Sequence, residues 1–274
     1  MSKVVLITGC STGIGRDLAE HLSQTGYTVI ATARRSETLD GLRVALKLQL
    51  DVTKQDSVDR AVEQVVQHFG RIDVLVNNAG YAVRGAVEDV PIEKVQGMFD
   101  ANVFGVMRMI RAVLPHMRQQ RAGRIINISS VAGKLVIPAN GTYSASKFAL
   151  EALSNALRLE LAPFGIDVVV IEPGSIKTQF HKTVESNAWM IFSNSNSAYW
   201  PLYKQYQKVN TDMRQEEVGP KNVSQVVKRV IETRRSKPRY IVGFPITGRL
   251  VLHLGDSVWD MVVRQMFRIA SSNG

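Results

Sequence analysis

The chain has 274 residues, 45% of them hydrophobic and 21% charged, which is enough apolar material for one large α/β domain or two small ones. Its single cysteine, Cys10, excludes an internal disulfide, and its five scattered histidines argue against a metal site. The net charge of +10 is spread along the chain without an aromatic-interleaved basic patch, which argues against a nucleic-acid partner and fits a solvated basic surface.

We expect a cytoplasmic protein. The apolar run near the start, Val4–Ile7, has only four residues, so no secretory signal is expected. No run approaches the roughly 18 to 20 apolar residues of a membrane span.

Short apolar segments alternate with longer segments of helical periodicity along most of the chain. Strands are predicted over Lys3–Gly9, Tyr27–Ala33, Val44–Val52, Ile72–Gly80, Gly123–Ser130, Ile166–Gly174 and Arg239–Gly243. Helices are predicted over Gly13–Thr25, Ser57–Phe69 and Ser144–Pro163. Continuously apolar strands are typical of a parallel sheet that is buried on both faces. The pattern predicts a single doubly wound α/β domain of the Rossmann type over 1–274, with a seven-stranded parallel sheet and helices on both faces.

The segment TGCSTGIG follows the first predicted strand and opens the first predicted helix. Gly9, Gly13 and Gly15 allow a tight turn and a close approach of the backbone to a ligand. A helix start also offers free N–H groups and a positive dipole end to a pyrophosphate. The spacing GxxxGxG differs from the commoner GxGxxG, and many glycine-rich turns merely join a strand to a helix. We interpret this one as a dinucleotide-binding turn, in which three further residues take part: Ser11, Thr12 and Ile14.

The second predicted strand ends in Arg34 and Arg35, where a carboxylate usually meets the ribose hydroxyls of NAD(H). Guanidinium groups instead bind a 2′-phosphate through charge-assisted, forked hydrogen bonds. The sequence therefore predicts NADP(H), unless one or both arginines are simply solvated. Asp51 and Val52 end the third strand at the height of the adenine. Asp51 either accepts a hydrogen bond from the base amine or caps the next helix.

Tyr143 and Lys147 share one face of a predicted helix because they are four residues apart. A free tyrosine titrates near pH 10, but a cation a few ångströms away lowers the phenol pKa by about one to three units. The pair is therefore expected to donate and accept a proton, and a surface Tyr–Lys contact is the alternative. The apolar stripe expected to pack this helix consists of Phe148, Leu150, Leu153, Leu157, Leu159 and Leu161.

Small and polar residues end two other predicted strands at the same edge of the sheet. Ser129 and Ser130 end the strand before the tyrosine, and open α/β folds bind ligands at this edge. A serine hydroxyl there is able to hydrogen-bond a substrate oxygen and polarise a carbonyl. Asn78, Ala79 and Gly80 end the fourth strand, where their small size lets a ribose or a nicotinamide lie against the backbone.

The motifs TGCSTGIG, DV, NNAG, ANVFG, SS…YSASK and PGSIKT occur in the order and spacing of one family. The chain resembles the short-chain dehydrogenase/reductase family along nearly its whole length. The resemblance implies an oxidoreductase that transfers a hydride reversibly between a nicotinamide and a carbonyl or an alcohol, in the reductive direction with NADPH.

The resemblance also implies roles for residues at matching positions. Ser130, thirteen residues before the tyrosine, matches the serine that positions the substrate oxygen, rather than Ser129. Tyr143 matches the proton donor and acceptor, and Lys147 matches the residue that lowers its pKa and binds the ribose hydroxyls. Asn102 matches the asparagine that holds a water in the proton relay. The segment expected to close over the nicotinamide contributes Pro173, Gly174, Ile176 and Thr178.

Residues 177–219 lack predicted strands and are long for a connection in a compact fold, which indicates a lid over a binding site. Their aromatic and Met side chains suit a large apolar substrate such as a steroid, a retinoid or a lipid-chain ketone, with Trp189 and Phe192 as contacts. Together with the glycine turn and ATARR, they are similar to the branch of hydroxysteroid 17β-dehydrogenases and retinol dehydrogenases. Ordinary packing under a long loop is the alternative.

The tail, residues 245–274, is amphipathic. It either packs on its own domain, faces another subunit or lies peripherally at a membrane surface. The family resemblance implies a homodimer or a homotetramer. Two other functions remain as alternatives: a non-enzymatic NADP(H)-binding redox sensor and a membrane-surface lipid carrier. The complete set of proton-relay residues argues against the sensor.

Overall fold

The computed structural model describes residues 2–180, 191–214, 217–245 and 255–269. Its centre is a seven-stranded parallel sheet in the order β3-β2-β1-β4-β5-β6-β7. The strands are β1 Val4–Ile7, β2 Thr28–Ala33, β3 Leu46–Gln49, β4 Val74–Asn77, β5 Gly123–Ile128, β6 Ile166–Pro173 and β7 Arg239–Val242. The predicted doubly wound domain is confirmed, and each strand lies within its predicted range.

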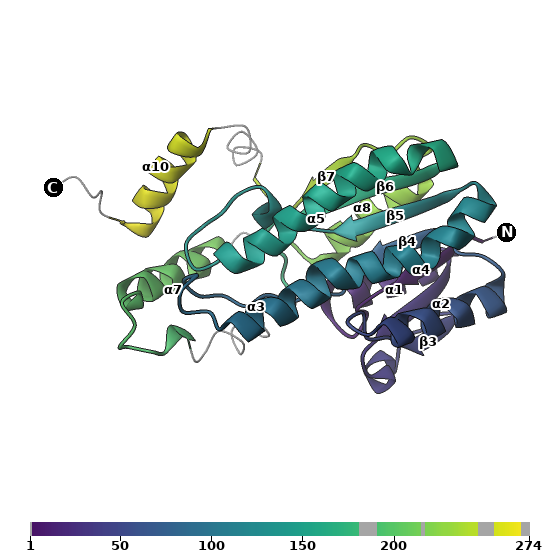
Figure 1. The fold of residues 1–274 in the computed structure, drawn as a ribbon, viewed down its shortest axis with the longest axis horizontal. Helices are drawn as coiled ribbons and strands as arrows, with labels where there is room; N and C mark the ends of the chain where they lie inside the picture. The colour runs from purple at the N-terminus through teal and green to yellow at the C-terminus, as the bar shows by residue number, and fades with distance from the viewer. Residues whose placement is uncertain (1, 181–190, 215–216, 246–254, 270–274) are drawn as a thin grey trace.

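Helices cover both faces of this sheet (Figure 1). Helices α2, α4 and α5 cover one face, and α1 and α8 cover the other. The helices are α1 Gly13–Gln24, α2 Gln55–Phe69, α3 Ile92–Phe99, α4 Gly105–Gln120, α5 Gly141–Glu160, α7 Trp200–Arg214, α8 Pro220–Glu232 and α10 Asp256–Phe267. A π-helical turn, Asp100–Phe104, joins α3 to α4. The sequence analysis gave no ranges for α3, α4 and α8, and in the region of α7 it predicted a lid without strands.

The core lies on both sides of the sheet, as β1 illustrates. Val4 and Leu6 belong to the apolar cluster under α2 and α4, whereas Val5 and Ile7 belong to the cluster under α1 and α8. Successive side chains of a strand point to opposite faces, so a strand covered on both faces must be apolar at every position. This is why the strands were readable as unbroken apolar runs.

The predicted packing stripe of α5 is right only in part. Leu150 and Leu161 are buried in the core and Leu157 packs against it, but Phe148 and Leu159 are exposed, with 43% and 68% of their surface accessible. The buried face of the helix consists of Thr142, Tyr143, Ser144, Ser146, Lys147, Leu150, Glu151 and Ser154. Small hydroxyl residues let the helix lie close to the sheet, and Asn127 on β5 donates to the Ser154 hydroxyl at 2.9 Å. Polar contacts therefore act together with the buried leucines in holding α5 on the sheet.

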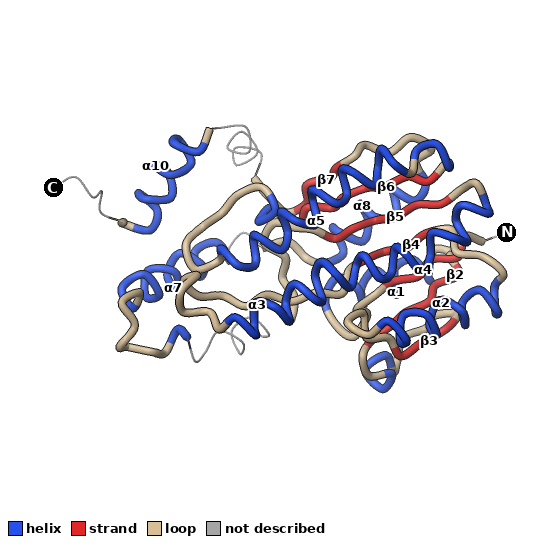
Figure 2. Tube along the Cα trace, in the orientation of Figure 1, coloured by secondary structure: helices blue, strands red, loops and turns tan. Residues whose placement is uncertain are grey.

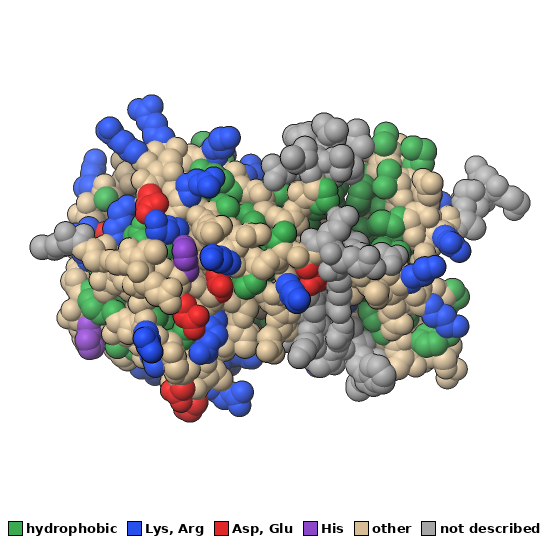
Figure 3. All heavy atoms as spheres, turned by 180° about the vertical axis from the view of Figure 1, so that it is seen from behind, with side chains coloured by type: hydrophobic (Ala, Val, Ile, Leu, Met, Phe, Trp, Pro, Cys, Tyr) green, Lys and Arg blue, Asp and Glu red, His purple; other side chains and the backbone are tan. Residues whose placement is uncertain are grey.

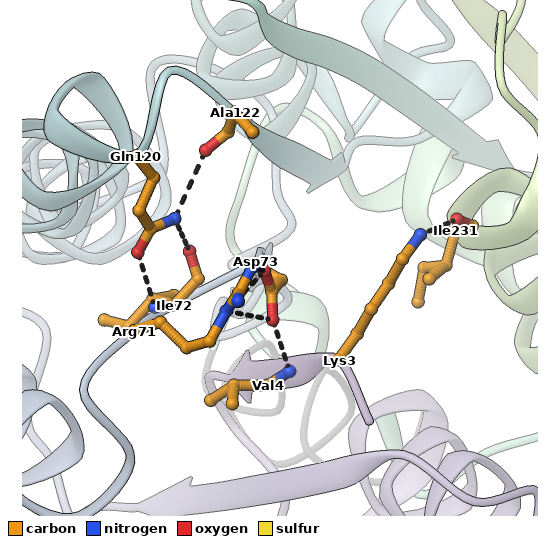
Figure 4. A network of polar contacts seen from close by, with 8 residues as sticks. All are labelled: Lys3, Val4, Arg71, Ile72, Asp73, Gln120, Ala122 and Ile231. Carbon is orange, nitrogen blue, oxygen red and sulfur yellow. Dashed lines mark hydrogen bonds and ion pairs between the residues drawn. The ribbon is translucent and has the colours of Figure 1, made fainter. Parts of the chain in front are cut away.

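A polar network fastens the strands at their amino ends (Figure 4). The Asp73 carboxylate accepts from the backbone N–H of Val4 at 2.8 Å and from the Arg71 guanidinium. The Gln120 side chain accepts from the Ile72 N–H at 3.2 Å and donates to the Ile72 carbonyl at 3.0 Å. These bonds join the starts of β1 and β4 to the end of α4.

Helices α7 and α10 lie beyond the carboxyl ends of the strands, apart from the sheet (Figure 2). They pack against each other, and Val263 and Phe267 of α10 are buried in an apolar cluster with Tyr203 and Tyr206 of α7. The described part of the tail therefore packs on its own chain. Lys and Arg side chains are spread over the sheet part of the face drawn in Figure 3, with Asp and Glu among them.

Candidate functional site

A cavity of about 1370 Å³ lies at the carboxyl ends of β1, β4, β5 and β6. Its walls come from the glycine turn, the strand ends, the start of α5 and helices α7 and α10. Nearly all the residues predicted for the cofactor and the chemistry reach it, and these are Gly9, Ser11, Thr12, Gly13, Ile14, Arg34, Asp51, Val52, Asn78, Ala79, Gly80, Ser130, Tyr143, Lys147, Pro173, Gly174, Ile176 and Thr178.

The glycine turn has the backbone that only glycine adopts readily. Gly9 and Gly13 have φ angles of 74° and 60°, in the left-handed region. A Cβ on Gly15 would lie 2.3 Å from the Gly9 carbonyl oxygen, so no side chain fits there. Asn78 fixes the turn, because its amide donates to the carbonyls of Thr8 and Gly9 at 2.9 and 3.0 Å. Asn78 therefore also shapes the cradle in which we expected it to bind a cofactor.

The start of α1 opens onto the cavity. Thr12 is the N-cap, makes no side-chain capping hydrogen bond, and no acidic residue lies in the first turn. The first N–H groups of a helix have no intrahelical partner and attract anions. Thr178 lies across from this turn, and its Cβ would be 3.4 Å from a Cβ placed on Gly13. The turn and helix start thus fit the pyrophosphate of a dinucleotide.

The two arginines after β2 differ in position. Both are exposed, but Arg34 lines the cavity and Arg35 is not among its lining residues. Asp51 also lines the cavity, and its Oδ1 accepts from the N–H and the hydroxyl of Thr53 at 3.0 and 2.8 Å. The N-cap of α2 is Lys54, so Asp51 orders the loop before the helix rather than capping it.

Ser130 and Tyr143 lie together at the end of β5. The Ser130 hydroxyl accepts from the Ala132 N–H at 3.1 Å, donates to the Pro173 carbonyl at 3.3 Å and interacts with the Tyr143 phenol. The neighbouring Ser129 also lines the cavity, but its hydroxyl has no hydrogen-bond partner among the described residues. The serine bonded to the phenol is the one the sequence predicted.

Burial has the largest effect on the phenol and raises the pKa of Tyr143 above its usual value of 10. The positive charge of Arg84 and the hydrogen bond from Ser130 act in the opposite direction. We expected Lys147 to lower this pKa, whereas the cation that does so in this structure is Arg84. The phenol is therefore protonated at neutral pH and ready to donate.

Lys147 is buried one helical turn after Tyr143. Its ammonium donates to the Ile128 carbonyl at 2.9 Å and lies 5.8 Å from the centre of the Tyr143 ring. Burial lowers the pKa of Lys147 from 10.5 to about 8, and the nearby Glu151 carboxylate partly opposes this change. Two of its three donors remain for a ligand, because an ammonium has three and one is used by Ile128.

Asn102 lies in the π-helical turn behind the cavity and is 1% exposed. Its carboxamide accepts from the Tyr81 N–H at 3.0 Å and donates to the Tyr81 carbonyl at 2.9 Å and the Ser146 hydroxyl at 3.1 Å. The side chain thus fastens the loop after β4 to α5. Its predicted part in a water relay stays a prediction.

The cavity wall beside α7 is largely apolar. Phe192 packs on Tyr203 and Tyr206, with ring centres 4.9 and 5.3 Å apart, and is not among the cavity's lining residues, so it supports the wall from behind. Trp189 lies outside the described residues. The lining residues that the sequence analysis did not select include Arg84, Leu135, Ile137, Phe180, Tyr206, Val209, Asn210, Trp259 and Met266. Of these residues, only Arg84 could have been selected from the sequence, because it lies shortly after the NNAG motif at the end of β4.

Residues 3–189 match the family described as short chain dehydrogenase. The chain belongs to this family. Within the described ranges, no helix is long and apolar enough to cross a bilayer.

The chain resembles known members of the short-chain dehydrogenase family over different shares of its length. It is 48% identical over 179 residues to 3-ketodihydrosphingosine reductase of Bacteroides thetaiotaomicron, a match that spans 65% of each chain. It is 42% identical over 207 residues to NADPH-dependent 1-acyldihydroxyacetone phosphate reductase of Schizosaccharomyces pombe, covering 74% of this chain and 69% of that one. A short-chain dehydrogenase structure from Streptomyces avermitilis matches with a TM-score of 0.82 and 36% identity, covering 97% and 98% of the two chains. The protein is thus an oxidoreductase of a family that uses nicotinamide cofactors.

Proposed function

We propose that this protein is an NADPH-dependent reductase of ketones carried by bulky, lipid-like molecules. The observation that carries this proposal is a buried, protonated Tyr143 phenol beside the Ser130 hydroxyl, in a large cavity with an apolar far wall. A neutral phenol is the form of tyrosine that donates a proton to a carbonyl oxygen.

Each residue of the site has a different role in the proposed reaction. Ser130 orients the substrate oxygen, and Tyr143 gives it a proton during reduction. The Lys147 ammonium holds the ribose hydroxyls of the cofactor. Asn102 holds the loop after β4 against α5, behind Tyr143. When bound, the nicotinamide supplies the hydride to the carbonyl carbon.

Arg34 supports NADP(H) as the cofactor. It is the arginine after β2 that lines the cavity, and no carboxylate replaces it at the end of that strand. A guanidinium binds a 2′-phosphate through charge-assisted hydrogen bonds. The relative from Schizosaccharomyces pombe is described as NADPH-dependent, which agrees with this assignment.

A lipid-like substrate is supported by the apolar wall and by the relatives' names, which describe reductases of a ketosphingoid base and of an acylated ketose phosphate. A steroid or a retinoid, as in the hydroxysteroid 17β-dehydrogenase and retinol dehydrogenase branch, remains a second candidate substrate. Large apolar side chains exposed near the π-helical turn and on α4 and α5 support a homo-oligomer, and these are Phe104, Met107, Phe148 and Leu159. Val258 and Met261, exposed on α10, support a peripheral membrane contact.

The test is NADPH consumption with long-chain, steroid, retinoid and small aromatic carbonyl compounds. The wild type should reduce long-chain ketones fastest, and Tyr143→Phe should lower kcat by about 10²- to 10⁴-fold. Binding of NADPH, followed by fluorescence, should be retained in the variant. Unchanged turnover in Tyr143→Phe would remove the proposed mechanism, and a preference for small ketones would remove the proposed substrate.

A further inference from the structure

An arginine, Arg84, lies in the cavity wall beside α7. Its Nη1 donates to the Tyr206 hydroxyl at 2.5 Å and to Asn210 Oδ1 at 3.5 Å, and its guanidinium lies 5.7 Å from the centre of the Tyr206 ring. Tyr206 and Asn210 line the cavity as well. Neutral groups on α7 therefore hold this cation at the surface of the cavity.

No carboxylate in the described part of the chain pairs with Arg84. The ion pairs between described residues do not include it, and its buried Nε has no hydrogen-bond partner among them. Arg239, by contrast, pairs with the buried carboxylates of Glu151 and Glu172. A guanidinium has five N–H donors. Among the described residues, Arg84 thus keeps donors that no side chain uses, at the surface of the cavity.

The acids closest to Arg84 in sequence are bound to hydroxyl groups instead. The Glu88 carboxylate accepts from the Tyr199 hydroxyl at 2.8 Å. The Asp89 carboxylate accepts from the hydroxyls of Ser197 and Tyr203, both at 2.5 Å. These bonds hold α7 and the turn before it against the loop after β4. They leave Arg84 available for an anion that arrives with a ligand.

Arg84 also lies within electrostatic reach of the acid. Its charge is one of the two influences that lower the pKa of Tyr143. The two residues are also neighbours in space: Thr142, next to Tyr143, donates to the carbonyl of Val83, next to Arg84, at 3.5 Å, and both Arg84 and Tyr143 line the same cavity. An anion bound at Arg84 would therefore lie close to a carbonyl held at Tyr143. Apolar residues complete the same cavity: Leu135, Ile137, Val209, Trp259 and Met266.

We propose that Arg84 determines which ketones the enzyme selects, by binding an anionic oxygen group, a phosphate or a carboxylate, close to the reacting carbonyl. This inference rests on the ketone reductase function proposed above and names its substrate class. Guanidinium forks bind both anions bidentately. The substrate then has three parts: an anionic group at Arg84, a ketone at Tyr143 and an apolar chain along the wall.

The experiment compares matched ketones with and without the anion. One pair is 1-palmitoyl-dihydroxyacetone phosphate and its dephosphorylated form, and the other is a long-chain 3-oxo carboxylate and its methyl ester. With Arg84→Met, kcat/KM for the charged members should fall by about 10- to 100-fold, the value of hydrogen bonds to a charged group. The loss should lie mainly in KM and should exceed the loss for the neutral members, which report the effect of Arg84 on the phenol alone. The charged member that loses more identifies phosphate or carboxylate as the preferred group.

Three further variants serve as controls. Arg84→Lys keeps the charge and should restore part of the efficiency toward the charged ketones. Arg35→Met removes an exposed arginine that is not among the cavity's lining residues, and it should leave the charged-to-neutral ratio unchanged. Tyr206→Phe removes the hydroxyl that accepts a hydrogen bond from Arg84 Nη1. It therefore tests the position of the guanidinium in a protein that keeps Arg84.

Two results would overturn the inference. An equal loss for charged and neutral ketones would mean that Arg84 acts only through the phenol, and a wild type that prefers the neutral members would exclude an anion site. Binding of decyl phosphate, which has no carbonyl, separates this inference from the proposed function. It should raise the Tm of the wild type and not of Arg84→Met, even if no ketone were reduced. The absence of that shift would also count against Arg84 as an anion site.

Discussion

Polar residues at the two ends of the sheet differ in how completely they are hydrogen-bonded. At the amino ends of the strands, Asp73 and Gln120 join backbone and side-chain groups of neighbouring elements (Figure 4). At the carboxyl ends, Ser129, Arg84 and Asn140 reach the cavity with buried polar atoms that have no partner among the described residues. Buried polar groups are normally hydrogen-bonded, so the orphaned ones that face the cavity are available to bond a ligand.

This difference separates stability from function within one fold. The network at the amino ends contributes to the free energy of unfolding and lies at the end of the sheet opposite the cavity. The carboxyl ends carry a buried ammonium and a buried phenol, and burial of the charged ammonium costs stability. Substitutions at the amino ends should therefore change the free energy of unfolding and leave activity unchanged, whereas substitutions at the carboxyl ends should lower activity.

The largest expected effect is at Lys147. Lys147→Met should lower kcat by about 10²- to 10⁴-fold, because the variant lacks the ammonium beside the proton donor. It should also raise the free energy of unfolding at pH 7 by about 2 kcal/mol. The buried ammonium costs about 1.4 kcal/mol per unit of its lowered pKa, and about 1 kcal/mol is lost with the hydrogen bond to Ile128. Urea denaturation and steady-state kinetics measure both changes.

The stability gain of Lys147→Met should depend on pH in a defined direction. The pKa of Lys147 is about 8 in the folded protein and 10.5 in the unfolded chain, so between these values the unfolded chain binds more protons. The free energy of unfolding of the wild type therefore rises with pH in this window. The gain of the variant should be largest below pH 8 and shrink toward pH 10.5. A constant difference from pH 7 to pH 10 would contradict a buried charged lysine.

The next largest effect is expected at Arg34, at the carboxyl ends of the strands, and it concerns the choice between NADPH and NADH. Arg34→Ala should weaken NADPH binding by about 10- to 100-fold and leave NADH binding nearly unchanged, because only NADPH has a 2′-phosphate. Arg35→Ala is the matched control and should have a much smaller effect. Neither change should alter Tm, since both side chains are exposed. Equal losses for NADPH and NADH would show that Arg34 does not bind the phosphate.

The smallest expected effect lies at the other end of the sheet. Asp73→Ala should lower the free energy of unfolding by about 1 to 2 kcal/mol, because the Val4 N–H and Arg71 lose their acceptor. Values of kcat and KM at low temperature should not change. Glu20→Ala removes an exposed carboxylate 3.7 Å from Arg16 and should cost less than about 0.5 kcal/mol. A loss of activity in folded Asp73→Ala would break the proposed separation.

The sequence predicted what depends on local pattern. The central strands are apolar at nearly every position because both faces of the sheet are covered, and the edge strands β3 and β7 kept enough apolar residues to be found as well. The glycine turn was found because Gly9 and Gly13 need left-handed backbone. Tyr143 and Lys147 were found from their spacing on one helix face, and Ser130 was chosen over Ser129 through the family resemblance. The structure brings these three residues together at the cavity as predicted.

Contacts between distant segments could not be predicted from spacing. The buried face of α5 was misjudged because Ser146 and Ser154 pack through hydrogen bonds to Asn102 and Asn127 rather than by hydrophobicity. The position of Arg84 at the cavity depends on Tyr206 and Asn210 of α7, which accept its hydrogen bonds and lie far away in the sequence. Trp259 reaches the cavity from the last helix, more than a hundred residues after the carbonyl of Val136 that its indole N–H contacts.

The position of α10 has a consequence for engineering the cavity. Trp259 and Met266 form part of the cavity wall, yet α10 is a separate element from α5, which carries Tyr143. A chimera in which residues 256–267 come from another sequence should therefore change which chain lengths fit and leave Tyr143 and Ser130 in place. Such exchanges offer a direct route to new selectivity.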